Sequence, residues 1–172
     1  MIWERFYPRE WVDSTYGIDW ESWQEKGIRG VIFDIDNTLV PHGAPADGRA
    51  KALFARLHGL GVKTCLLSNN KKPRVASFAS EVGSPYIYKA GKPAVRNYKR
   101  AMEQMGTDKG STLFVGDQLF TDVYGANRAG IYGILVKPIN PKEEIQIVLK
   151  RYLEAVVLHF YKDSKRILEK NS

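Results

Sequence analysis

Short apolar runs alternate with longer segments of mixed polarity from about residue 30 onward. The runs are continuously apolar and of strand length, which is typical of strands buried on both faces of a sheet; they cover 31–35, 63–67, 86–88, 112–115 and 131–136. The segments between them have helix length, at about 47–59, 73–83, 93–105 and 119–128. Strands that alternate with helices predict an α/β fold, a parallel sheet of about five strands with helices on both faces.

The two ends of the chain depart from this alternation. Residues 1–29 are rich in aromatic side chains and hold all four tryptophans. Residues 141–172 have the pattern of an amphipathic helix, with an apolar stripe formed by Ile145, Val148, Leu149, Tyr152, Val156, Phe160 and Ile167. We expect a single domain over 1–172 with 30–140 as its core. The aromatic segment is expected to cover the sheet or to contact a membrane, and the helix to dock on the sheet, a second subunit or lipid.

Polar residues follow four successive predicted strands, at the edge where parallel sheets bind ligands. They are Asp34 and Asp36, then Ser68 and Asn69, then Lys92, and finally Asp117 and Asp122. Taken alone, each of these motifs also has an interpretation without a ligand: a loop aspartate, a turn, a surface lysine or a helix cap. A calcium-binding loop starting at Asp34 is excluded, because its sixth and twelfth positions are Leu39 and Pro45 instead of glycine and glutamate.

Taken in order, these motifs resemble those of the haloacid dehalogenase (HAD) superfamily: Asp-x-Asp-x-Thr, then Ser, then Lys-Pro, then Gly-Asp-x-x-x-x-Asp. The strings at 34–40, 68–70, 116–123 and 134–139 are similar to the bacterial YqeG family of subfamily IIIA HAD phosphatases, itself related to the mitochondrial phosphatidylglycerophosphate phosphatase. The resemblance implies a Rossmann-like HAD fold with strand order 3-2-1-4-5. Asn37 departs from the glycine that many HAD phosphatases carry.

The resemblance also implies a role for each motif residue. Asp34 would attack phosphorus and Asp36 would act as acid and base. Mg²⁺ would be held by Asp34, the Asp36 carbonyl and Asp117, with Asp122 supporting the metal or orienting Lys92. Phosphoryl oxygens would be held by Thr38, Ser68, Asn69 and Lys92.

The spacing of the motifs leaves no room for a cap domain over the site. Segments 37–67 and 69–91 are each filled by a predicted helix and its connections. An open site favours a large or surface-bound phosphate ester. Three basic residues after the second motif are expected at the substrate rim: Lys71, Lys72 and Arg74.

Charge and cysteine content narrow the remaining choices. Lys and Arg exceed Asp and Glu by 26 to 19, a net charge of +7 that favours anionic partners. Cys65 is the single cysteine, which excludes an intrachain disulfide and a multi-thiolate zinc site. We expect a cytoplasmic, Mg²⁺-dependent phosphatase, with peripheral contact to a membrane, that acts on a phosphate monoester such as a phospholipid headgroup. The alternatives are a soluble phosphatase for nucleotide, sugar or polynucleotide phosphates, and a binding protein without turnover. Nucleic acid is not the expected partner, and the sequence does not fix the oligomer.

Overall fold

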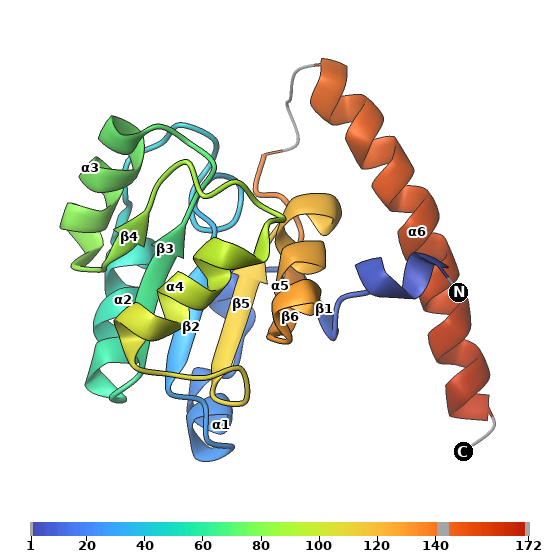
Figure 1. Cartoon of the computed structure of the whole chain (residues 1–172), viewed down its shortest axis with the longest axis horizontal. Coiled ribbons are helices and arrows are strands. Elements are labelled where there is room, and N and C mark those ends of the chain that lie inside the picture. The colour runs from blue at the N-terminus through green and yellow to red at the C-terminus, as the bar shows by residue number, and fades with distance from the viewer. Residues whose placement is uncertain (1, 141–144, 171–172) are drawn as a thin grey trace.

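A computed structural model describes residues 2–140 and 145–170 and contains a six-stranded, all-parallel sheet (Figure 1). The strands are β1 (Glu10–Val12), β2 (Gly30–Phe33), β3 (Lys63–Leu67), β4 (Tyr86–Ile87), β5 (Thr112–Gly116) and β6 (Tyr132–Val136). Their order in the sheet is β1-β6-β5-β2-β3-β4, so the predicted order of the five predicted strands, β2 to β6, is confirmed. The prediction missed β1, which pairs with β6 at the edge and is too short to show an apolar run.

Helices cover both faces of this sheet. One face carries α1 (Trp20–Glu25), α2 (Gly48–Gly59) and α3 (Lys72–Val82), and the other carries α4 (Val95–Met105) and α5 (Tyr124–Ala129). Ile32 and Phe33 are consecutive in β2 and therefore point to opposite faces. Both are fully buried, Phe33 against Trp20 on the first face and Ile32 in the cluster around Tyr98 on the second. Burial on both faces explains the continuous apolar runs of the strands.

No cap lies between the motifs, since the described segments 37–67 and 69–91 hold only α2, and α3 with β4, beyond their strands and loops. The predicted helices on these segments agree with the structure to within a few residues. The helix predicted over 119–128 is wrong in one respect, because its first part is a separate π-helical turn, η3 (Leu119–Val123), that precedes α5. The N–H of Val123 bonds to the Gln118 carbonyl at 3.1 Å, five residues back, which is the spacing of a π-turn.

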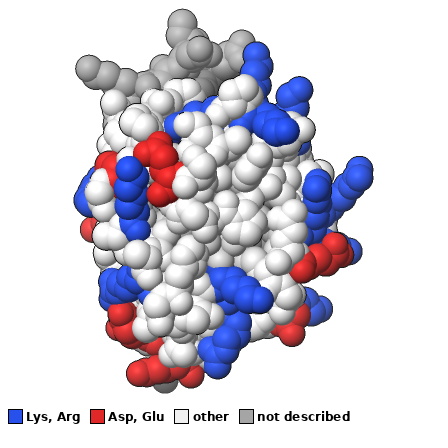
Figure 2. All heavy atoms as spheres, turned by 90° about the vertical axis from the view of Figure 1, so that its left-hand side faces the viewer, with Lys and Arg blue, Asp and Glu red and all other residues white. Residues whose placement is uncertain are grey.

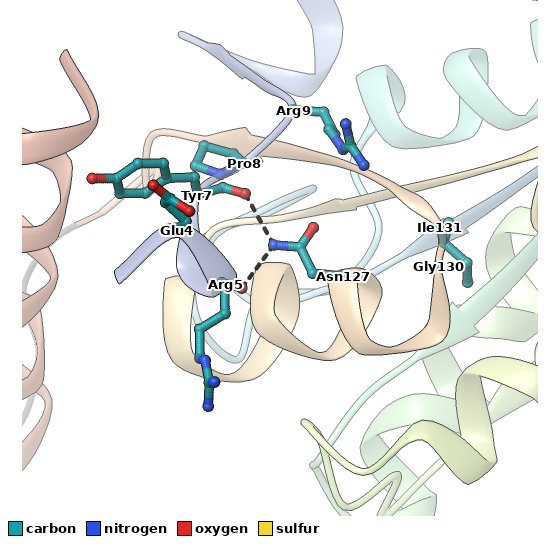
Figure 3. A pocket seen from close by; sticks show the side chains of 8 residues that line it. All are labelled: Glu4, Arg5, Tyr7, Pro8, Arg9, Asn127, Gly130 and Ile131. Carbon is teal, nitrogen blue, oxygen red and sulfur yellow. Dashed lines mark hydrogen bonds between the residues drawn. The ribbon is translucent and has the colours of Figure 1, made fainter. Parts of the chain in front are cut away.

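The aromatic N-terminal segment packs largely on the body of the protein. Trp20 is 1% exposed, and Trp23 packs edge-on against Tyr132 with 4.9 Å between the ring centroids. The short helices η1 (Ile2–Phe6) and η2 (Thr15–Gly17) complete this segment. The Asn127 amide of α5 donates to the carbonyls of Arg5 and Tyr7, each at 2.9 Å, beside a surface hollow of about 300 Å³ (Figure 3). The packing role expected for these aromatics is therefore confirmed for most of them.

The C-terminal helix α6 (Ile145–Lys170) runs along the β1 side of the molecule, with η1 beside it (Figure 1). Its buried side is formed by Glu154, Val157 and Tyr161, and Tyr161 packs against Tyr7 at 5.1 Å. The predicted apolar stripe does not dock on the sheet: its described members, Tyr152, Val156, Phe160 and Ile167, are exposed. The predicted range extends to 141–144 and 171–172, and the stripe to the side chains of Ile145, Val148 and Leu149, all of which lie outside the described residues.

Candidate active site

Three carboxylates meet at the carboxyl ends of β2 and β5, which are neighbours in the sheet. Asp34 follows β2, Asp117 follows β5, and Asp122 lies on η3. One oxygen from each lies within 4.8 Å of the other two, and all three residues are buried. The approach of Asp122 requires the absence of a side chain at Gly116, because a Cβ there would lie 2.5 Å from the Asp122 Oδ2. The structure therefore brings these three of the predicted site residues together.

Lys92 supplies a buried positive charge inside this group. Its Nζ lies 2.6 Å from the Asp34 Oδ1 and 2.6 Å from the Asp122 Oδ1. Burial would lower the pKa of Lys92, but the two carboxylates outweigh it and raise the pKa above its ordinary value. The loop that carries Lys92 is fastened by Asn69, whose Oδ1 accepts the backbone N–H of Lys92 at 2.8 Å. The Asn69 side chain therefore braces Lys92.

Three carboxylates with one amine leave an excess of negative charge in a buried space. Burial, partly offset by Lys92, raises the pKa of Asp34 to about 6. Burial and the carboxylates of Asp34 and Asp122 raise the pKa of Asp117 to about 8, against the opposing charge of Arg151. Such a group is stabilised by a cation, and carboxylate oxygens are the donors that hard divalent ions prefer. The residues present therefore fit a divalent metal.

Asp36 lies outside the group formed by the three described carboxylates. Its Oδ1 accepts hydrogen bonds from the Gly43 N–H at 2.8 Å and from Arg74 at 2.9 Å, and its Oδ2 accepts one from the Asn70 amide at 3.3 Å. Burial would raise the pKa of Asp36, but the hydrogen bonds from Gly43 and Arg74 outweigh it and hold the pKa below its ordinary value. In this conformation Asp36 is an ionised acceptor held by residues around the start of α3.

The remaining motif residues line the same edge of the sheet. Thr38 is buried, and its hydroxyl lies 3.3 Å from both the Asp34 Oδ2 and the Asp117 Oδ1. Ser68 is also buried, and its hydroxyl accepts the N–H of Asn70 at 3.1 Å. Asn37 has a φ of 63°. Asparagine adopts this left-handed conformation more readily than most residues other than glycine, which accounts for its presence where many HAD enzymes carry glycine.

Comparison with known proteins identifies the family. Residues 42–130 match the family described as "haloacid dehalogenase-like hydrolase". The "Probable phosphatase YqeG" of Bacillus subtilis (strain 168) is 36% identical over 159 residues, which cover 92% of each chain. The chain belongs to the haloacid dehalogenase-like hydrolase family. It is a HAD-type phosphatase, similar to YqeG, as its motifs predicted.

Two further comparisons place this HAD phosphatase among its relatives. The "Phosphatidylglycerophosphate phosphatase 1, chloroplastic/mitochondrial" of Arabidopsis thaliana is 29% identical over 88% of this chain and 47% of that protein. The 3-deoxy-D-manno-octulosonate 8-phosphate phosphatase of Moraxella catarrhalis, solved with magnesium, phosphate and KDO, superposes with a TM-score of 0.55 at 15% identity. That superposition covers 72% of this chain and 76% of the other. At this identity the likeness concerns the fold.

The three basic residues predicted at the substrate rim of this HAD phosphatase do not share one environment. Lys71 and Lys72 are exposed at the start of α3, whereas Arg74 turns inward to Asp36, and both partners are less than a fifth exposed. Figure 2 shows the side of the molecule on which α3 lies, and there Lys and Arg are spread around a largely uncharged centre. The net positive charge is therefore not gathered into one patch on this side.

Sequence reasoning missed the contribution of α6. The Arg151 Nη2 lies 2.5 Å from the Asp117 Oδ2, and its Nη1 lies 2.6 Å from the Asp117 carbonyl oxygen. Glu154 accepts the N–H of Leu119 at 3.0 Å and Arg151 Nη1 at 3.3 Å. These polar positions lie opposite the apolar stripe, so the helical pattern assigns them to solvent. Their i, i+3 spacing was the one signal available, and it is common on solvated helices.

Proposed function

We propose that this chain is a Mg²⁺-dependent phosphomonoesterase in which residues 1–172 act as one capless unit and Asp34 is the nucleophile. The observation that carries the proposal is the buried group of Asp34, Asp117 and Asp122 around Lys92 at the carboxyl edge of the sheet. Three acidic oxygens and one ammonium form a site that can hold a divalent cation and a phosphoryl group together.

The reaction proceeds in two displacements at phosphorus. A carboxylate oxygen of Asp34 forms a bond to phosphorus while the bond to the ester oxygen breaks, giving an aspartyl-phosphate. Asp36 first takes up a proton from solvent and donates it to the departing alkoxide. It then takes a proton from the water that attacks the aspartyl-phosphate, and inorganic phosphate is released. Asp36 begins paired with Arg74, so it must turn from that partner toward the ester to act.

The remaining site residues stabilise the charge that develops on the phosphoryl group. Lys92, Thr38 and Ser68 offer an ammonium and two hydroxyls at the strand ends, and the N–H of Asn69 would complete the cradle. A bound Mg²⁺ would offset the negative charge of the carboxylates and the phosphoryl group. Asp34 and Asp117 would hold the metal with the Asp36 carbonyl, while Asp122 lies against Lys92 and close to the other two carboxylates.

The substrate that fits best is phosphatidylglycerophosphate or a related phospholipid with a terminal phosphate. Similarity to a protein with that name supports it, as does the lack of a cap over the described site. No helix in the described part of the chain has the length and apolar character needed to cross a bilayer. Access to such a lipid therefore calls for contact from the side.

The outer side of α6 is the surface that suits this contact. It presents the exposed residues Tyr152, Leu153, Val156, Phe160 and Ile167, and Ile2 and Trp3 of the neighbouring η1 are exposed as well. An exposed apolar helix side on a protein with a net charge of +7 is complementary to an anionic lipid surface.

The test compares turnover of phosphatidylglycerophosphate in mixed micelles with turnover of p-nitrophenyl phosphate, a sugar phosphate and a nucleotide. We expect magnesium-dependent hydrolysis of both the lipid and the aryl ester, with the highest kcat/KM for the lipid. A double variant, Val156→Ser with Phe160→Ser, should lose lipid turnover and keep aryl turnover. Higher kcat/KM for a soluble phosphate would overturn the lipid assignment. An inactive, folded wild-type protein would overturn the phosphatase mechanism itself.

A further inference from the structure

The turn that follows β5 carries Asp117 and depends on α6 for its polar contacts. The backbone carbonyl of Asp117 accepts from Arg151, and the N–H of Leu119 is accepted by Glu154. Beside them, Lys150 Nζ lies 2.6 Å from the Gln118 Oε1. Buried backbone groups need such partners, and here one distant helix supplies them for Asp117 and Leu119 of the turn.

Asp117 is held on both sides by these contacts. Its Oδ1 lies 3.3 Å from the Thr38 hydroxyl, on the side of Asp34, and its Oδ2 lies 2.5 Å from Arg151. The Asp117 side chain is fully buried, whereas that of Arg151 is 21% exposed. The guanidinium uses one nitrogen for the carboxylate and the other for the carbonyl, a two-point contact that a lysine cannot reproduce. One carboxylate oxygen is left facing the metal-binding group.

We propose that Arg151 is a positioning residue of the metal site, and that α6 is therefore part of that site. Arg151, braced by Glu154, fixes the orientation of Asp117 and so prearranges an oxygen for the divalent ion. The inference rests on the assignment of Asp117 as a metal ligand in the proposed function. Residues that orient a metal ligand typically change metal affinity by about 10- to 100-fold when they are removed.

The charge at the site is compatible with this role. Lys92 pairs with Asp34 and Asp122, and Arg151 is shared between Asp117 and the buried carboxylate of Glu154, so the carboxylates outnumber the two cations. Arg151 touches the Asp117 oxygen that is turned away from Thr38 and Asp34, so it does not occupy the space between the carboxylates. Orientation of Asp117 is then expected to outweigh the repulsion between Arg151 and the metal.

The packing of α6 on the body of the protein holds Arg151 in place beside Asp117. Val157 and Tyr161 are buried on the same side of the helix as Glu154, and Leu158 packs with Leu119 and Trp11. A small hollow of about 120 Å³ remains between α6 and the sheet, lined in part by Asp117, Arg151 and Glu154. The polar contacts, more than close packing, therefore join the helix to the turn at this point.

The test measures the affinity of the full-length chain for Mg²⁺ by isothermal titration calorimetry, without substrate. Arg151→Gln is expected to weaken Mg²⁺ binding about tenfold or more. Arg151→Lys should weaken it least of the three variants, and the effect of Glu154→Gln should lie between those of the two Arg151 variants. Arg166→Gln, which changes an exposed arginine further along the same helix, is the matched control and should leave the affinity unchanged. At saturating Mg²⁺, kcat for p-nitrophenyl phosphate should return to near the wild-type value.

The outcomes separate the inference from the proposed function. Unchanged or tighter Mg²⁺ binding in a folded Arg151→Gln variant overturns the positioning role, since a purely structural contact would change only thermal stability. If Arg151→Gln does not fold, the same criterion applies to Arg151→Lys and Glu154→Gln. A wild-type chain that binds Mg²⁺ but lacks turnover overturns the phosphatase mechanism and leaves the positioning inference to stand on the affinities. A wild-type chain that binds no Mg²⁺ overturns both.

Discussion

Asp117→Asn is expected to make the metal-free protein more stable at pH 7 while abolishing its response to Mg²⁺. Asp117 is 2% exposed and lies beside Asp34 and Asp122. Burial and these two carboxylates raise its pKa from 3.8 to about 8, although Arg151 opposes the shift. Asparagine keeps nearly the same shape without the charge. The substitution therefore removes the cost of burying a carboxylate beside Asp34 and Asp122, and it also removes a metal ligand.

The size of the effect follows from the shift in pKa. The folded protein binds this proton more tightly than the unfolded chain, so its stability falls as the pH rises from about 4 to about 8. At pH 7 the cost amounts to about 4 kcal/mol at most, at about 1.4 kcal/mol for each pH unit above the unfolded pKa. The interaction with Arg151 is already contained in this pKa, but the buried NH₂ group of the asparagine needs hydrogen-bond partners of its own, and this offsets part of the gain in stability. We expect a net gain of about 2 kcal/mol, which corresponds to an increase in Tm of about 4–8 °C for a chain of this size.

The assay is thermal unfolding in EDTA and in Mg²⁺, at pH 7 and at pH 5. A pH of 5 is only about one unit above the pKa of Asp117 in the unfolded chain. The stability that Asp117→Asn gains over the wild type should therefore fall below about 1 kcal/mol at this pH. Mg²⁺ at about a hundredfold excess over its Kd should stabilise the wild type by about 2.7 kcal/mol and the variant by much less.

Asp36→Asn is the control with the opposite sign. The pKa of Asp36 is held below its ordinary value, so its ionised form stabilises the folded protein above the unfolded pKa, and this stability is lost as the pH falls through the folded pKa. Asp36→Asn should therefore lower the Tm at pH 7. The reasoning is refuted if Asp117→Asn is less stable than the wild type in EDTA at pH 7, if its gain is the same at pH 5, or if it keeps the full Mg²⁺ shift.

Three other predictions follow from the site. Asp34→Asn should reduce turnover of an aryl phosphate by about a thousandfold or more without loss of the fold, because an amide is a poor nucleophile; a tenth of wild-type activity in the folded variant would contradict it. Replacing Mg²⁺ by Ca²⁺ should inhibit, since calcium takes more ligands at longer distances, and equal turnover with both ions would exclude the mechanism. Arg74→Ser should change the pH dependence of kcat for the aryl ester, because Arg74 contacts Asp36, whereas Lys71→Ser with Lys72→Ser should affect only lipid turnover and its salt dependence; equal effects of the two variants would contradict this division.

Much of the fold could be predicted because local patterns carry the information. The central strands are buried on both faces, so their residues form uninterrupted apolar runs, and the loop residues at their carboxyl ends meet wherever the strands are parallel neighbours. That reasoning brought Asp34, Lys92, Asp117 and Asp122 to one site. It missed β1 because an edge strand of three residues makes few contacts and has no distinctive run. It also missed the π-turn at 119–123, since a one-residue change in hydrogen bonding leaves the helical pattern intact.

The sequence by itself therefore indicated the family, and the resemblance to that family implied the order of five strands and the residues expected at the site. Only the tertiary structure decided which side of α6 is buried, since the stripe that looks suited to docking is exposed and the polar side carrying Glu154 and Arg151 faces the sheet. It also decided that Arg74 pairs with Asp36. The physical reason is that each such contact joins residues more than 30 positions apart, and a charged side chain on a helix follows the same local pattern whether it meets water or a buried carboxylate.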